Sequence, residues 1–184
     1  AEQYYSASLE IFQALSDPGK MSRAMNNLGY SYMEKGDYEA SRPLLVKSLE
    51  LSQYIGADPL SAAILESLGT LSNAMGDCNA SIRYYREGLR VCKKLNALPL
   101  AMEIILGFAM IFSSQKDIEQ AVDLLCLVYH HPSVVHKIRR RAEKLVQELT
   151  HVRAAECLNA ENMEITSIVI DHAISNLLFP HPSR

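Results

Sequence analysis

Long apolar runs are missing from this chain of 184 residues. None approaches the roughly 20 consecutive apolar residues that a membrane-spanning helix needs. The N-terminus also lacks a secretion-signal pattern, so we expect a cytoplasmic location and no membrane partner.

Strong charge of one sign is missing too, because the formal net charge is −3. That balance gives no overall attraction to nucleic acid or anionic lipid, and a nucleic-acid partner is not favoured.

Catalytic and metal-binding patterns are also missing. The sequence has no GxSxG, Walker, HExxH or glycine-rich phosphate-binding motif. His130, His131 and His136 lie close together, but their spacing matches no known set of metal ligands. We expect the two adjacent histidines to flank a turn and to be partly exposed. The sequence therefore predicts a non-enzymatic protein without catalytic residues, cofactor or metal ion.

The cysteines show no CxxC spacing, which excludes the commonest zinc and redox patterns. Three of them fall at small or apolar positions of expected helices. Free thiols, mostly buried in a reducing cytoplasm, are the simplest interpretation. The four are Cys78, Cys92, Cys126 and Cys157.

What the sequence does contain is a repeat with a period of 40 residues. Residues 27–41 recur as residues 67–81, and a weaker third copy spans residues 107–121. Each copy has two stretches with apolar residues at helical spacing, such as Ala24, Leu28 and Tyr32. A fixed period of this size indicates an array of helix pairs.

Turn residues separate the two helices of each copy. Gly36 and Gly76 suit the left-handed conformation at a helix C-terminus, whereas the third copy has Lys116 in that place. The next residue is always an aspartate, which can accept hydrogen bonds from the first turn of the following helix. These expected N-caps are Asp37, Asp77 and Asp117. Between copies, Asp58 and Pro59 suit an N-cap and a first helical residue.

Glycine also occurs inside expected helices, at Gly29 and Gly69. Glycine in a helix costs about 1 kcal/mol relative to alanine, so a compensating reason is needed. Close approach of a neighbouring helix supplies one, and the third copy keeps this place small with Ala109.

These recurring positions resemble the tetratricopeptide repeat (TPR). In the first copy they are Leu28-Gly29, Tyr32, Gly36-Asp37-Tyr38, Ser41, Leu45, Ser48 and Leu49. The resemblance implies an all-α fold: a right-handed TPR-type α-solenoid of antiparallel helix pairs with C-terminal capping helices. The 40-residue period and residues 124–132 are also similar to the TPR arms of bacterial signal-transduction ATPases that regulate transcription, such as the maltose regulator. That similarity implies a sensor or scaffold arm of a larger bacterial regulator.

The period divides the chain into an array over residues 1–131 and capping helices with a tail over residues 132–184. The array comprises a half repeat at 1–16 and full repeats at about 20–55, 59–95 and 99–130. An amphipathic helix is predicted over residues 133–151, a shorter one around 152–159 and a last one over 165–178. The apolar stripe of the first is Val135, Ile138, Ala142, Leu145, Val146 and Leu149.

The chain opens on the second helix of a repeat, which predicts a longer parent protein with further repeats upstream. Tyr4, Leu9 and Phe12 then lack packing partners. Uncovered ends of repeat arrays associate readily, so we expect a homodimer through this end. Self-association that oligomerises the parent protein is therefore the alternative to an interaction module.

In TPR proteins the first helix of each pair lines a concave groove, which the resemblance makes the candidate site for a protein or peptide. Only one expected groove residue is basic, which disfavours capture of a C-terminal carboxylate; an extended or helical apolar segment suits the site better. Simple solvent exposure remains the alternative. The expected residues are Arg23, Asn26, Asn27, Tyr30, Met33, Glu34, Glu66, Thr70, Asn73 and Met110.

A local basic run is the remaining feature. Residues 133–153 contain six lysines and arginines against two glutamates, a balance of +4. Most of it lies between Lys137 and Lys144. We interpret it as the charged outer face of a capping helix, with contact to an acidic partner or nucleic acid as the alternative.

Overall fold

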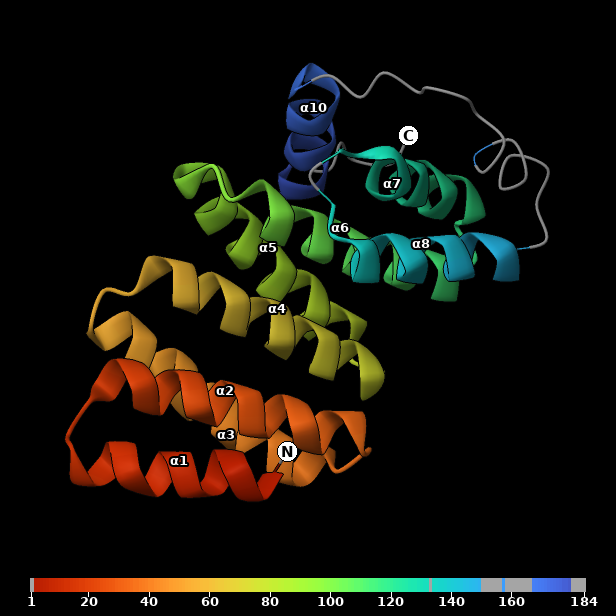
Figure 1. The fold of residues 1–184 in the computed structure, drawn as a ribbon. Helices are drawn as coiled ribbons and strands as arrows, with labels where there is room; N and C mark the ends of the chain where they lie inside the picture. The colour runs from red at the N-terminus through yellow and green to blue at the C-terminus, as the bar shows by residue number, and fades with distance from the viewer. Residues whose placement is uncertain (1, 133, 150–156, 158–166, 180–184) are drawn as a thin grey trace. The chain divides into compact units, whose positions relative to one another are not determined.

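The computed structural model describes residues 2–132, 134–149, 157 and 167–179. Over these residues the chain is all-α and contains no strand (Figure 1). The helices of the repeats begin and end within two residues of their predicted bounds, which confirms the expected fold class. They are α1 (Glu2–Ala14), α2 (Pro18–Glu34), α3 (Tyr38–Tyr54), α4 (Asp58–Ala74), α5 (Cys78–Leu95), α6 (Leu98–Ser114), α7 (Ile118–His130), α8 (His136–Glu148) and α10 (Ser167–Leu178).

The chain forms two compact units, residues 1–91 and residues 92–184. In the first unit, α1 packs on α2, α2 on α3, and α3 on α4. In the second unit, α6 packs on α7 and α7 on α8. Because short turns join these helices, consecutive ones run antiparallel, as expected for helix pairs.

The turns inside the pairs have the chemistry expected from the sequence. Asp37 caps α3 by accepting a hydrogen bond from the Ala40 N–H at 3.1 Å. Gly36 and Gly76 have φ angles of +82° and +80°. Lys116 takes the same left-handed conformation, with φ +65°, so the third turn keeps its shape without glycine. The other two aspartates cap in the same way: Asp77 accepts from Ala80 N–H at 2.9 Å and Asp117 from Gln120 N–H at 3.3 Å.

The prediction for Asp58 was wrong by one position. The N-cap of α4 is Ala57, without a side-chain cap, and Asp58 is the first helical residue. The reason is the preceding turn, where the Asp58 N–H donates to the Gly56 carbonyl at 3.0 Å. Pro59 is then the second helical residue, where a missing N–H still costs nothing.

Close approach between helices explains the internal glycines, as expected. A Cβ built on Gly29 would lie 2.9 Å from Leu45 Cδ2 and 3.3 Å from the Ser41 carbonyl oxygen. The Ser41 hydroxyl also donates to the Gly29 carbonyl at 2.7 Å. Glycine therefore lets α3 lie directly against the α2 backbone.

The core of the first unit gathers residues from α2, α3 and α4. Met33, Leu45, Ile64, Leu68 and Leu71 form one buried cluster. Tyrosines and leucines at its margin, including Tyr84 of α5, are partly buried against it. This cluster holds α2 and α4 side by side.

In the second unit, α8 presents the predicted apolar stripe only in part. Ile138, Ala142 and Val146 are buried, but Val135 is 55% exposed. The helix begins at His136, and Val135 is its extended N-cap, so this side chain does not share the helical face. The predicted helix around 152–159 lies outside the described residues except for residue 157.

The cysteine prediction was wrong for two of the four residues. Cys126 and Cys157 form a disulfide, with Cα atoms 5.6 Å apart. Cys78 and Cys92 are free. Cys157 is 31 residues from its partner, and no spacing pattern marks such a pair. Burial raises the pKa of the Cys92 thiol to about 11, so this thiol is protonated and poorly reactive.

Candidate partner-binding surface

A capped helix start defines one end of the surface. The Asp17 carboxylate accepts from the Lys20 N–H at 3.0 Å and pairs with the Lys20 ammonium at 2.9 Å. The backbone hydrogen bond from Lys20 is the largest cause that lowers the pKa of Asp17. The same ammonium lies 5.7 Å from the centre of the Phe12 ring. Lys20 is therefore occupied within the chain, and its charge is partly neutralised.

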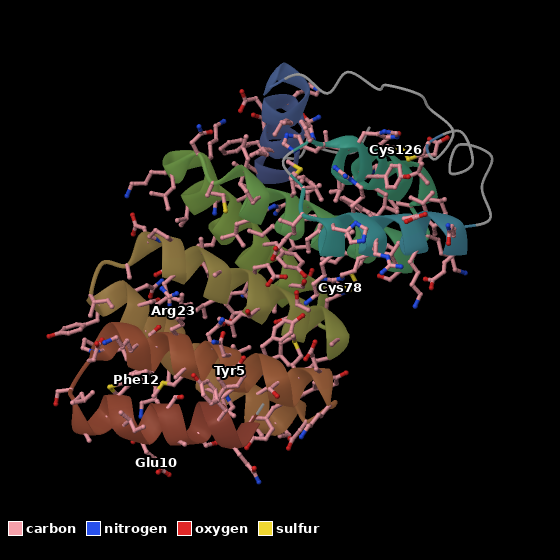
Figure 2. The ribbon with its side chains drawn as sticks, in the orientation of Figure 1. Tyr5, Glu10, Phe12, Arg23, Cys78 and Cys126 are labelled. Atoms are coloured by element: carbon pink, nitrogen blue, oxygen red, sulfur yellow. A yellow bond between two sulfur atoms is a disulfide. The ribbon has the colours of Figure 1, made fainter. Side chains whose placement is uncertain are left out.

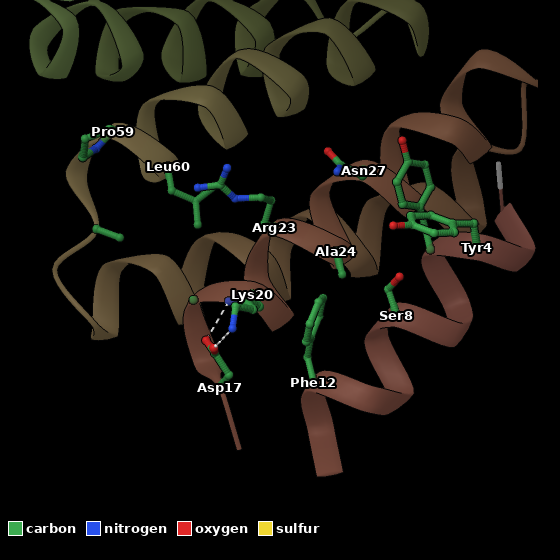
Figure 3. Close-up of a pocket in the computed structure, with 13 residues that line it drawn as sticks. Tyr4, Ser8, Phe12, Asp17, Lys20, Arg23, Ala24, Asn27, Pro59 and Leu60 are labelled. Carbon is green, nitrogen blue, oxygen red and sulfur yellow. Dashed lines mark hydrogen bonds and ion pairs between the residues drawn. The ribbon is translucent and has the colours of Figure 1, made fainter. Parts of the chain in front are cut away.

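A hollow of about 690 Å³ opens beside this turn, between α1, α2 and the start of α4. Figure 3 shows Phe12 and Ser8 of α1 on one side, Arg23 and Asn27 of α2 above them in this view, and Leu60 of α4 near Arg23. Glu10 points away from α2, on the other side of α1 (Figure 2). The lining residues are Tyr4, Tyr5, Ser8, Phe12, Asp17, Gly19, Lys20, Arg23, Ala24, Asn27, Ala57, Pro59 and Leu60.

A smaller hollow of about 250 Å³ continues along α2. It shares Tyr5 and Asn27 with the larger hollow, so the two adjoin. Its lining residues are Tyr5, Asn26, Asn27, Tyr30, Ser31 and Glu34. Together the two hollows follow the face of α2 from its first turn to its last residue.

The exposed face of α2 combines opposite charges with amides. Arg23, Asn27, Tyr30 and Glu34 recur at steps of four, three and four residues, so they share one face of the helix. Neither Arg23 nor Glu34 has an ion-pair partner among the described residues. The Asn26 Oδ1 atom is buried and has no hydrogen-bond partner within the described part of the chain. A buried acceptor without a partner is destabilising in the free protein.

The structure brings five of the ten predicted groove residues together in these hollows: Arg23, Asn26, Asn27, Tyr30 and Glu34. Met33 departs from the expectation, since only 7% of it is exposed and it belongs to the core. Its position on α2 faces α4 rather than α1. Met110 is half-buried and belongs to the second unit.

The predicted residues on α4 are engaged with one another. The Thr70 hydroxyl donates to Glu66 Oε1 at 2.9 Å and lies 3.0 Å from the Tyr85 hydroxyl. Asn73 is half-buried further along the same helix. Thr70 and Glu66 therefore contribute less to an open site than the α2 residues.

Sequence reasoning identified Phe12 as lacking a packing partner but left the wall that α1 contributes out of the expected groove. Tyr5, Ser8 and Phe12 line the larger hollow, although α1 is the second helix of its repeat. The 40-residue shift could have revealed them, because it places Tyr5 on Leu45 and Ser8 on Ser48, which both face α2.

Part of the basic run on α8 has a structural role. The Arg139 guanidinium donates to the carbonyls of Tyr129 and His131, each at 3.0 Å. A cation that binds carbonyls at the end of α7 stabilises that helix terminus. His131 is only 4% exposed, so the expectation of a partly exposed histidine was wrong there. Desolvation and Arg139 lower the pKa of His131.

Packed antiparallel helix pairs define an all-α helical-repeat protein over the described residues. The tetratricopeptide repeat family model matches residues 20–94. Over that range, which contains the two clearest copies of the repeat, the chain is similar to that family. No curated protein is matched by the sequence. No helix in the described residues is both long and apolar enough to cross a membrane.

Proposed function

We propose that this protein is a non-enzymatic interaction module that binds a protein or peptide along α2. The observation that carries this proposal is the pair of adjoining hollows that follow the α2 face. Aromatic rings of α1 form one wall. The amides of α2 and two charged residues, Arg23 and Glu34, form the other, and neither charge has an ion-pair partner among the described residues. Such a mixture suits an amphipathic segment better than a small apolar ligand.

Peptide selection on the immobilised protein tests this function. We expect selected peptides to shift the backbone amide resonances of Asn26, Asn27 and Tyr30. Arg23→Ala should weaken their binding, whereas Lys47→Ala, which removes an exposed cation of α3 outside both hollows, should not. Peptides that shift only residues outside the two hollows, or no enriched peptide at all, would contradict the proposal.

The wider role we propose is the sensor or scaffold arm of a larger bacterial transcription regulator in the cytoplasm. The 40-residue period and the similarity of residues 124–132 to such arms support it. The Cys126–Cys157 disulfide weighs against a cytoplasmic location, where disulfides are rare. Quenching the cells in acid and alkylating the thiols under denaturing conditions, which also exposes the buried Cys92, decides this: four modified cysteines support the cytoplasmic proposal, and only two contradict it.

Self-association is the second candidate function, and the outer face of α1 favours it. Ile11 is 57% exposed and Leu15, just after the end of α1, is 66% exposed; they lie one helical turn apart and neither lines the hollow between α1 and α2. Sedimentation of Ile11→Glu against Gln13→Glu tests this, since both sites are exposed but only Ile11 belongs to the apolar stripe. A monomeric wild-type protein at high concentration would exclude this function.

A further inference from the structure

The face of α1 that lines the hollow is equivalent, one repeat later, to a face of α3. On α3 that face is covered by α2. A shift of 40 residues takes Tyr5 and Ser8 of α1 to Leu45 and Ser48 of α3. Leu45 and Ser48 are completely buried, because α2 packs over them. Tyr5 and Ser8 are only half-buried and line the hollow. The two positions thus differ in whether a helix covers them.

Two small residues seven positions apart allow α2 to pack on α3. The Ser22 hydroxyl donates to the Ser48 carbonyl at 2.9 Å, and the Ser48 hydroxyl donates to the Ser22 carbonyl at 2.6 Å. Gly29, seven residues after Ser22, lies against the Leu45 side chain. Larger residues at either position would hold the helices apart.

The next repeat has the same spacing, and there the facing residue is a tyrosine, as in α1. Ala62 and Gly69 of α4 are seven residues apart, and Tyr85 lies over Gly69. The Tyr85 hydroxyl is 3.0 Å from the Thr70 hydroxyl. A shift of 80 residues takes Tyr5 to Tyr85. A helix that packs on Tyr5 in the same way needs a glycine opposite the tyrosine ring. It also needs threonine or serine after that glycine, so that a hydroxyl can reach the Tyr5 hydroxyl.

The charges on α2 add a direction. A helix that covers α1 as α2 covers α3 runs parallel to α2. Its first turn then lies toward Arg23 and its last turn toward Glu34, which are about 16 Å apart along α2. Both charges lack ion-pair partners among the described residues. An acidic residue in the first turn and a basic residue in the last would pair with them and also suit the helix dipole.

We propose that the α1–α2 hollow docks one amphipathic helix of a partner protein, which deepens the proposed function and rests on it. The helix has a small residue seven positions before a glycine, and serine or threonine after that glycine. It is about 17 residues long, the length that α2, α4 and α6 share. Its glycine faces Tyr5, its small residue faces Ser8, and its ends are acidic and then basic.

A synthetic peptide with the sequence of residues 57–75 and the change Ala74→Lys has all these features and serves as the probe. Fluorescence anisotropy of the labelled peptide should show saturable binding to the whole chain. Gly69→Leu in the peptide should weaken binding at least tenfold. In the protein, Ser8→Arg fills the hollow and should weaken binding at least tenfold. Gln13→Arg, on the same helix but outside the hollow, should change it less than twofold.

Circular dichroism melting of both protein variants shows whether they remain folded, and Tyr5→Ala gives a second variant if Ser8→Arg does not. Absence of saturable binding up to about 1 mM peptide, or equal binding of the Gly69→Leu peptide, overturns the docking proposal. A dimer that Ser8→Arg dissociates and the peptide does not would also overturn it, because a second copy would then be the occupant. Selected peptides that still bind α2 in those cases would leave the proposed function standing.

Discussion

The ring of Tyr85 occupies the space that a side chain on Gly69 would need. A Cβ on Gly69 would overlap the ring carbons of Tyr85, and the Ser81 hydroxyl donates to the Gly69 carbonyl at 2.8 Å. Two contacts from α5 thus converge on one backbone position of α4. Because Tyr85 is only 1% exposed, the ring has little room to move aside.

Gly69→Ala should therefore destabilise the protein despite the better helix propensity of alanine. Overpacking costs about 1–3 kcal/mol, against a propensity gain of about 1 kcal/mol. Because the buried Tyr85 ring cannot easily move, we expect the upper end of the overpacking cost and a net loss of about 2 kcal/mol in urea denaturation. Gly69→Ala should cost less stability when it is made in the Tyr85→Leu variant than when it is made in the wild type, because the ring is then absent. A single variant as stable as the wild type would show that the helices separate easily.

Lys116→Gly should stabilise the protein by about 1 kcal/mol, because a residue with a Cβ is disfavoured in the left-handed conformation. Gly76→Ala is the matched control, since Gly76 has the same conformation and no atom near its missing side chain. It should lose a similar amount. Thermal unfolding of both variants measures this, and a destabilised Lys116→Gly would indicate that the lysine side chain makes a stabilising contact.

Glu103 should make stability depend on pH. Burial raises its pKa above the usual 4.5, against the opposing effects of Arg141 and Lys137. The folded state therefore binds the proton more tightly than the unfolded state, and stability is lost as the pH rises from 4.5 through the raised value. Glu103→Gln should be more stable than the wild type at pH 7, with a gain that shrinks toward pH 4.5.

The measurement is denaturation of both proteins across this pH range. Glu119→Gln, at an exposed site of α7, is the matched control and should follow the wild type throughout. A gain for Glu103→Gln that does not vary with pH would mean that packing, rather than ionisation, distinguishes the two side chains.

Reduction of the Cys126–Cys157 disulfide should lower the free energy of unfolding by about 2–4 kcal/mol, because the unfolded chain regains the freedom of a 31-residue loop. Cys126→Ser should behave like the reduced wild type and should not respond to reductant. Cys78→Ser should respond as the wild type does, since Cys78 is free. Identical unfolding curves with and without reductant would show that the disulfide does not stabilise the folded state.

The sequence by itself determined the helix pairs, their turns and their caps. Gly36 and Asp37 form a turn by contacts with residues no more than five positions away, so the pattern can be recognised in the sequence. Even the internal glycines could be interpreted, because an unfavourable residue at a repeated position implies a close neighbour.

Only the tertiary structure decided which faces are covered. Met33 and Asn26 are both on α2, yet one packs into the core and the other reaches an open hollow. The wall of Tyr5 and Ser8 and the disulfide between Cys126 and Cys157 depend on the same information. The position of a residue in a helix determines the face on which its side chain lies. Whether that face is buried depends on packing with another helix, which comes from a segment distant in the chain.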